Sequence, residues 1–176
     1  MADHAAMERI WEAHMAGEFV AQDVEATMST MTGDPAVLHV PTAMGGIGYD
    51  AVKDFYARWF IGRNPEDFTV RSLSRTVGDH GIVDEMIVSF THDIEVPWIL
   101  PGVAPTGRSV SVPVVAVVGF RGTAVAGEHI YWDQAAVLLQ TQLLGAGAVR
   151  HLPVIAVPED VLDGKVPLNR LTESWP

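Results

Sequence analysis

The order of periodic segments along the chain predicts an α+β fold. Apolar residues recur at helical spacing over residues 7–31 and again over residues 49–60. After Asn64-Pro65 the pattern changes, and residues 69–76, 82–94, 109–120 and 128–139 form candidate strands. Helices followed by antiparallel strands are typical of α+β proteins, whereas βαβ proteins alternate the two elements.

Each helix is predicted from one apolar face. In the first, Trp11, Met15 and Phe19 lie four residues apart, and Gly17 weakens the middle of the segment. A turn at Asp34-Pro35 leads to a short strand at 36–40, and a glycine-rich loop at 45–48 precedes the second helix. Asp50 stands near the start of this helix, where the helix dipole stabilises negative charge.

The four later strands are bounded by turn and loop signals at 78–81, 97–107 and 121–127. The strand at 109–120 is apolar on both faces, with Val115 and Val117 opposite Val112, Val114, Ala116 and Val118. Two apolar faces require two partners. We therefore expect the core on one side and a second copy of the chain on the other, which makes a homodimer.

Composition limits the function classes. A chain of 176 residues with 48% hydrophobic residues is expected to form one domain, here 1–150, with a proline-rich tail at 151–176 packing on it. The net charge of −11 argues against binding nucleic acid phosphates or anionic membranes. The absence of cysteine excludes disulfides, thiolate nucleophiles and cysteine-based zinc sites.

No segment of the sequence has the features of a signal peptide or of a membrane-spanning helix. Residues 1–15 carry four charged side chains and have no apolar centre, so they do not read as a signal peptide. The longest apolar run, 112–120, is interrupted by Pro113 and is too short to cross a bilayer. We expect a soluble, cytoplasmic protein.

The segment Glu128–Gln134 concentrates groups that can move or hold protons. Alternate residues of a strand point the same way, so His129, Tyr131 and Asp133 are predicted to share one face. This face is either the wall of a pocket that performs acid–base chemistry or a polar surface facing solvent. For Asp133 the alternative to catalysis is a hydrogen bond to the main chain at the strand end.

Three motifs in order carry a family resemblance over residues 7–144. They are Phe90-Thr91-His92, Pro105-Thr106-Gly107-Arg108 and the segment from Glu128 to Asp133. Together with the helix-then-strand order, they resemble the SnoaL-like polyketide-cyclase branch of the nuclear transport factor two-like superfamily. The residues at 39–42, 83–86 and 131–134 are similar to those of uncharacterised members of the superfamily that are labelled carboxymethylenebutenolidase-related. The Gly-x-Ser-x-Gly motif of α/β hydrolases is absent.

The resemblance implies a cone-shaped barrel, in which a strongly curved antiparallel sheet wraps around N-terminal helices and leaves a pocket at one end. It also implies a His–Asp pair that transfers protons without metal or organic cofactor. In this chain His92 and Asp133 match that pair. His92 could instead be a surface histidine at a turn. His129 and Tyr131 share the predicted face of Asp133 and complete the catalytic candidates.

The predicted substrate-binding residues are Trp132, Glu85, His39, Trp98 and Phe90. Glu85 could equally form an ion pair, for example with Arg108. His39 could equally occupy a position in the core or at its edge. The tryptophans could line either a pocket or the core. A metal site built from His39, His92 and His129 lacks any close ligand spacing, so we expect no metal and no cofactor.

We therefore expect a cofactor-independent enzyme acting on a small hydrophobic organic ligand. The candidate reactions are cyclisation, isomerisation or hydrolysis of a carbonyl, lactone or epoxide compound, in lyase, isomerase or hydrolase classes. The alternative is a non-catalytic ligand-binding or dimerisation module of the same fold. A pocket shared by Asp133 and His92 would favour the enzyme.

Overall fold

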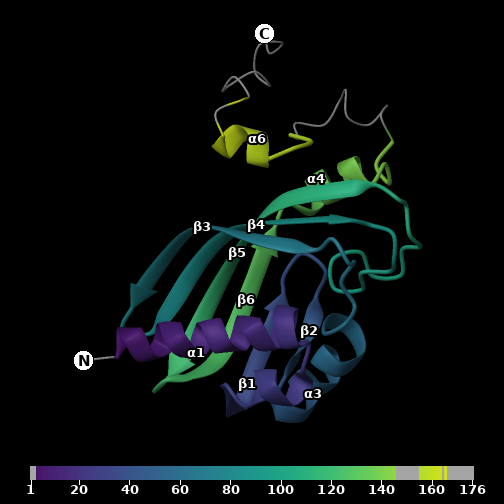
Figure 1. The fold of residues 1–176 in the computed structure, drawn as a ribbon. Coiled ribbons are helices and arrows are strands. Elements are labelled where there is room, and N and C mark those ends of the chain that lie inside the picture. The colour runs from purple at the N-terminus through teal and green to yellow at the C-terminus, as the bar shows by residue number, and fades with distance from the viewer. Residues whose placement is uncertain (1–2, 146–154, 164, 166–176) are drawn as a thin grey trace.

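One curved six-stranded sheet organises the molecule (Figure 1). The computed structural model describes residues 3–145, 155–163 and 165. The strands are β1 (Met31–His39), β2 (Met44–Ile47), β3 (Thr69–Gly78), β4 (Gly81–Thr91), β5 (Ser109–Arg121) and β6 (Ala124–Trp132). Their order is β2-β1-β6-β5-β4-β3, which leaves the sheet unclosed between its edges β2 and β3. The predicted α+β fold with a strongly curved sheet is confirmed.

Strand pairing places the core on the concave side of this sheet. β1 and β6 run parallel, and every other neighbouring pair is antiparallel. In β5 the residues that alternate inward are buried, as the apolar alternation predicts: Val110, Val112, Val114, Ala116 and Val118. The helix α1 (His4–Ala16) lies across this concave side (Figure 1).

The predicted continuous helix at 7–31 is wrong at residues 22–23, where it breaks, and after Met28, where it ends. After α1 the chain forms a π-helix, η1 (Gly17–Ala21), and Gln22 ends it in the left-handed conformation with φ 51°. Asp23 then caps α2 (Val24–Met28), because its side chain accepts hydrogen bonds from the main-chain N–H groups of Glu25 and Ala26. A local capping signal thus interrupts a pattern that is helical overall.

The second predicted helix comprises α3 (Tyr49–Phe55) and the π-helix η2 (Tyr56–Phe60). The glycine-rich segment before it is the short strand β2, where we predicted a loop. A Cβ on Gly45 would lie 1.9 Å from the carbonyl oxygen of Val37, and one on Gly46 would lie 2.5 Å from the main chain of Ala51. Glycine therefore lets β2 fit between β1 and α3.

The predicted strand at 128–139 is wrong in its second half. β6 ends at Trp132, and α4 (Gln134–Gln140) follows at once. The Asp133 side chain accepts a hydrogen bond from Ala136 N at 3.1 Å and so caps this helix. The run from Ala135 to Leu139 is too apolar for its periodicity to separate strand from helix, and the cap decides between them.

Part of the C-terminal segment contacts the sheet. Glu159, in α6 (Glu159–Leu162), accepts hydrogen bonds from Arg71 in β3 at 2.6 Å and from Ser111 in β5 at 2.5 Å. The rest of the predicted tail, 151–154, 164 and 166–176, lies outside the described residues. The division into a domain at 1–150 and a tail stays a prediction. None of the described helices combines the length and hydrophobicity needed to cross a membrane.

Candidate functional site

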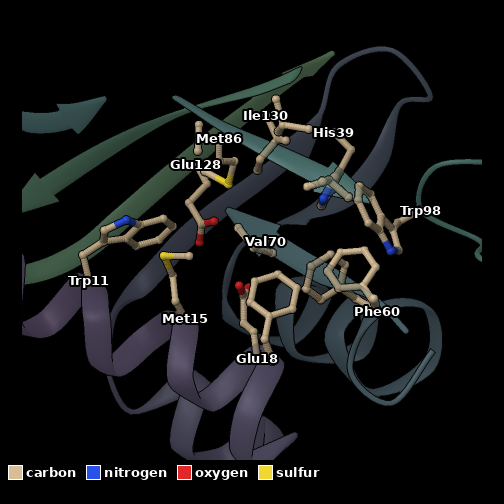
Figure 2. A pocket seen from close by; sticks show the side chains of 15 residues that line it. Trp11, Met15, Glu18, His39, Phe60, Val70, Met86, Trp98, Glu128 and Ile130 are labelled. Atoms are coloured by element: carbon tan, nitrogen blue, oxygen red, sulfur yellow. The ribbon is translucent and has the colours of Figure 1, made fainter. Parts of the chain in front are cut away.

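A small cavity lies between the first helical segment and the concave side of the sheet (Figure 2). Its volume is about 50 Å³. The wall is mainly aliphatic and aromatic, and the side chains of Glu18, His39 and Glu128 supply its ionisable groups. Both carboxylates point into the space between η1 and β6 (Figure 2). Few, convergent polar groups in an apolar cavity are typical of ligand sites.

A larger hollow of about 630 Å³ adjoins the cavity on its outer side. The two share Met15, Phe19, Phe68 and Val70, so these four side chains form the wall between them. A volume of 50 Å³ holds a few water molecules, whereas pockets for drug-sized ligands measure roughly 300–1,000 Å³. Any ligand larger than a few atoms requires these side chains to move.

Glu18 and Glu128 belong to a buried cluster with His14 and Tyr56. Nε2 of His14 lies 3.1 Å from Oε1 of Glu128, 3.3 Å from Oε1 of Glu18 and 3.1 Å from the Tyr56 hydroxyl. That hydroxyl donates to Oε1 of Glu128 at 3.2 Å. All four residues are at most 4% exposed. One imidazole therefore serves two carboxylates in a site shielded from bulk water.

Thr30 fixes the orientation and proton of the His14 ring. The Thr30 hydroxyl donates to the carbonyl of Thr27 at 2.6 Å and lies 2.7 Å from Nδ1 of His14. Because the hydroxyl hydrogen is already used, Nδ1 must be the donor in this contact. The other nitrogen, Nε2, is thereby directed at the two carboxylates.

The electrostatics of the cluster favour a charged histidine. Burial lowers the pKa of His14, but attraction to Glu128 and then Glu18 outweighs it and raises the pKa to about 10. Burial raises the pKa of Glu18 above its ordinary value, despite the opposing charge of His14. Burial, followed by the two carboxylates, raises the pKa of the Tyr56 phenol. Glu18 therefore binds a proton more tightly than an ordinary carboxylate does.

The same cluster has atoms that could ligate a cation. Nε2 of His14 and one oxygen each of Glu18 and Glu128 lie within 4.8 Å of one another. Imidazole and carboxylates are suitable ligands for several divalent metals. In the structure Nε2 instead contacts both carboxylates as an ion pair. The expectation of a metal-free site stays a prediction that chelation can test.

A further buried carboxylate, Asp84, is fully occupied by structural partners. Arg75 donates to its two oxygens at 2.6 and 2.8 Å, and Trp11 Nε1 donates to Oδ2 at 2.5 Å. Such a two-pronged arginine pair holds both groups in place. The arginine pair joins β3 to β4, and the Trp11 hydrogen bond ties α1 to the same carboxylate.

The predicted face of His129, Tyr131 and Asp133 exists but points away from the cavity. All three residues are exposed, while their neighbours Glu128 and Ile130 line the cavity. The expectation that these three residues line the cavity is therefore wrong, because the inward face of β6 carries the intervening residues. Asp133 instead lines an outer hollow of about 550 Å³ together with Glu85. Tyr131 pairs with Val115, which in turn pairs with Glu85, so Glu85 also lies on the outer face.

His92 lies apart from both Asp133 and the cavity. Its Nδ1 is 3.1 Å from the Thr106 hydroxyl, and its main chain pairs with Thr106, Gly107 and Arg108. Burial lowers the pKa of His92. The side chain is fully buried, which rules out the surface turn weighed above. The expected pocket shared by His92 and Asp133 is not formed. The hydrogen bonds of His92 to residues 106–108 instead hold the loop to the strand end.

Three of the predicted substrate-binding residues do gather near the cavity. His39 and Trp98 line it, and the Trp132 ring lies 6.0 Å from that of His39 and 5.6 Å from that of Trp98. Phe90 is buried against Phe68, with ring centroids 5.9 Å apart. Phe90 thus supports the cavity wall from behind.

Sequence reasoning missed His14, Glu18, Tyr56 and Glu128. The sequence carried signals for His14, Glu18 and Glu128. His14 and Glu18 lie four residues apart on the apolar face of the first helical segment, and Glu128 has the same strand parity as apolar residues. An ionisable residue on an otherwise apolar face requires a buried partner or a function. Tyr56 offered no signal beyond its place on the apolar face of its helix.

The comparisons with known proteins agree with this architecture. A model of the SnoaL-like domain matches residues 11–127, which is more than half of the chain. The chain belongs to the SnoaL-like domain family. This finding confirms the resemblance to SnoaL-like proteins, but nothing in it supports the narrower resemblance to carboxymethylenebutenolidase-related members. No curated protein matches the sequence.

Solved structures share the SnoaL-like fold at low sequence identity. TsrD from Streptomyces laurentii superimposes with a TM-score of 0.65 at 17% identity, over 82% of this chain and 100% of its own. A putative SnoaL-like polyketide cyclase from Jannaschia sp. gives 0.60 at 19%, over 76% and 92%. A protein from Catenulispora acidiphila with a ketosteroid isomerase-like fold, in complex with trimethylamine, gives 0.57 at 15%, over 75% and 91%.

Proposed function

We propose that this SnoaL-like protein is a cofactor-independent acid–base catalyst acting on a small, largely apolar carbonyl compound. The observation that carries the proposal is the pair of buried carboxylates, Glu18 and Glu128, which line an apolar cavity and share the single imidazole of His14. Like charges held close in a buried site favour the sharing of a proton. The corresponding reactions are proton removal next to a carbonyl, with isomerisation or cyclisation.

Glu18 is the proposed base. In the step, the substrate C–H proton moves to the Glu18 carboxylate, and the C–H electron pair forms the enolate. The protonated Glu18 then returns the proton at another carbon, which completes an isomerisation, whereas return to the same carbon only exchanges the hydrogen. Because the pKa of Glu18 is raised, this carboxylate is a stronger base than an ordinary carboxylate.

The other members of the cluster have supporting roles. His14, held by Thr30, remains protonated and offsets the two carboxylates. Tyr56 donates to Glu128 and so keeps that carboxylate in place. As substrate proton transfer neutralises Glu18, the charge of the cluster becomes balanced between Glu128 and His14. This charge balance favours the state that follows proton abstraction.

The relatives support a small-molecule function without fixing it. The Jannaschia protein is described as a putative polyketide cyclase, and the Catenulispora protein binds trimethylamine. Identities below 20% extend only the fold to this chain. The placement of Asp133, His129 and Tyr131 outside the cavity moves our proposal for the base from Asp133 to Glu18.

A substrate panel tests the function. Lactones, epoxides and β-dicarbonyl compounds should be incubated with the wild-type protein, with and without chelator, and with Glu18→Gln. We expect turnover of a carbonyl compound that survives chelation and falls at least ~100-fold in the variant. Full activity in Glu18→Gln would contradict the proposal. Loss on chelation would indicate a metal at His14, Glu18 and Glu128, and binding without turnover would indicate a binding module.

A further inference from the structure

His39 is a buried polar residue surrounded by aromatic rings. Its ring centroid lies 5.3 Å from that of Phe55, 5.4 Å from Phe60 and 5.2 Å from Trp98. The side chain is 3% exposed and lines the cavity. The nearby indole N–H groups are used elsewhere, since Trp98 donates to Asn64 and Trp132 donates to Gln134.

Nδ1 of His39 has no hydrogen-bond partner among the described residues. The Met44 main chain approaches the ring but makes no hydrogen bond to this atom. Leaving a buried polar atom unpaired destabilises the folded state. A phenylalanine would fill such an aromatic surrounding without that cost, so the histidine calls for an explanation other than packing.

The ring is uncharged at neutral pH. Burial lowers the pKa of His39 to about 4, although Glu128 and the Met44 main chain oppose this shift. A neutral imidazole has one N–H donor and one acceptor lone pair. It can therefore donate a hydrogen bond to an oxygen without bringing a charge into the apolar cavity.

His39 and the carboxylates occupy different parts of the same cavity wall. His39 pairs with Ile130 across β1 and β6, two residues along β6 from Glu128. Figure 2 shows the His39 ring beside Trp98, with Glu18 and Glu128 on the side nearer Trp11. A ligand between them would meet a hydrogen-bonding ring at one end and a base at the other. Aromatic side chains in the cavity wall, including Phe60, favour a flat ligand.

We infer that His39 holds the substrate oxygen and that the substrate is a flat, conjugated carbonyl compound, admitted when the shared wall side chains Met15, Phe19, Phe68 and Val70 move. This inference rests on the proposed function. The carbonyl oxygen lies against the imidazole of His39 once the wall side chains have moved, and the acidic C–H faces Glu18. When the proton moves to Glu18, the C–H electron pair forms a C=C bond, and the carbonyl π pair moves to the oxygen that His39 hydrogen-bonds.

A matched pair of ligands tests the role of His39 without requiring turnover. 4-Fluorophenol carries the hydroxyl of an enol on a flat ring, and 4-fluorotoluene replaces it with a methyl group of similar size. Fluorine NMR titrations give the dissociation constant of each. The variants are His39→Phe, His39→Gln as a polar replacement, and His129→Phe as the same change on the outer face.

The expected result concerns the preference for the phenol, expressed as the ratio of the two dissociation constants. This preference should fall about tenfold in His39→Phe, which is the usual scale of one hydrogen bond. It should persist in His129→Phe and be partly restored in His39→Gln. An unchanged preference in His39→Phe, or failure of both ligands to bind the wild-type protein, would overturn the inference.

Two further outcomes separate this inference from the proposed function. A preference that changes in Glu18→Gln but not in His39→Phe would place the oxygen at the carboxylates and overturn the role of His39. If the preference for the phenol falls in His39→Phe but no compound of the panel is turned over, the result would support the binding role of His39 and contradict catalysis.

Discussion

His14 and Glu128 are joined by a buried contact of 3.1 Å between Nε2 and Oε1. The same nitrogen also lies 3.3 Å from Glu18. A single imidazolium therefore compensates two carboxylates that helix and strand bring together from positions 110 residues apart in the sequence. The unequal count of charges explains why burial can raise the pKa of Glu18 even beside a positive ring.

The charge of His14 should make stability fall at alkaline pH. Because the folded-state pKa is raised to about 10 from 6.5, its stabilising contribution is complete below pH 6.5 and is lost as pH rises through 10. We expect the free energy of unfolding in urea to decrease over this range. His14→Gln should flatten the decrease, and an equal slope in both proteins would contradict a charged His14.

His39 should have the opposite effect at acid pH. Its folded-state pKa is lowered to about 4, so stability is complete above pH 6.5 and is lost as pH falls toward 4. A shift of this size corresponds to about 3 kcal/mol. His39→Phe should remove this part of the acid destabilisation in urea unfolding at pH 6.5 and pH 4. Identical losses in the two proteins would show that His39 is protonated when folded.

Gly17 should be intolerant of a larger side chain. A Cβ there would lie 2.6 Å from the Thr27 hydroxyl and 3.1 Å from its main-chain nitrogen, where η1 packs on α2. Gly17→Ala should destabilise the protein by about 1–3 kcal/mol, although alanine is the better helix former. Gly33→Ala is the control, since nothing lies within 4 Å of its Cβ position. Equal stability of both variants would show that the contact relaxes freely.

The predicted homodimer would form through the outer face of the sheet. Val83 pairs with Val117, which pairs with His129, and the two valines are 40% and 41% exposed. Light scattering should return twice the 19.0 kDa mass of one chain at micromolar concentration. Val117→Lys should then give the single-chain mass, because a charge in an apolar interface is costly. A wild-type mass of 19.0 kDa would contradict the dimer.

The sequence predicted the fold better than the site. Periodicity located the long strands, because each buries one face and alternates accordingly. Periodicity failed at the ends of these elements, where a single residue determines the boundary. Asp133 caps α4 directly after β6, and Gln22 ends η1. Such capping and left-handed positions are local features that an average over a window conceals.

The candidate site was missed although parity within β6 indicated the inner face, because Glu128 alternates with the apolar Ile130 and Trp132. His129, Tyr131 and Asp133 were correctly placed on one face, but the chemistry-bearing residue of the inner face is Glu128. Its partners come from the first helical segment, and sequence spacing alone does not bring them together. His39 was the one ionisable residue predicted at the site that the structure places in the cavity wall.

Deuterium exchange into a carbonyl compound tests the central claim most directly. Flat cyclic ketones and β-dicarbonyl compounds should be incubated in D₂O, and incorporation at the carbon next to the carbonyl followed by NMR. We expect the wild-type protein and Asp133→Asn to accelerate exchange equally, and Glu18→Gln to be at least ~100-fold slower while remaining folded by circular dichroism. Full exchange in Glu18→Gln together with loss in Asp133→Asn would contradict proton transfer in the cavity.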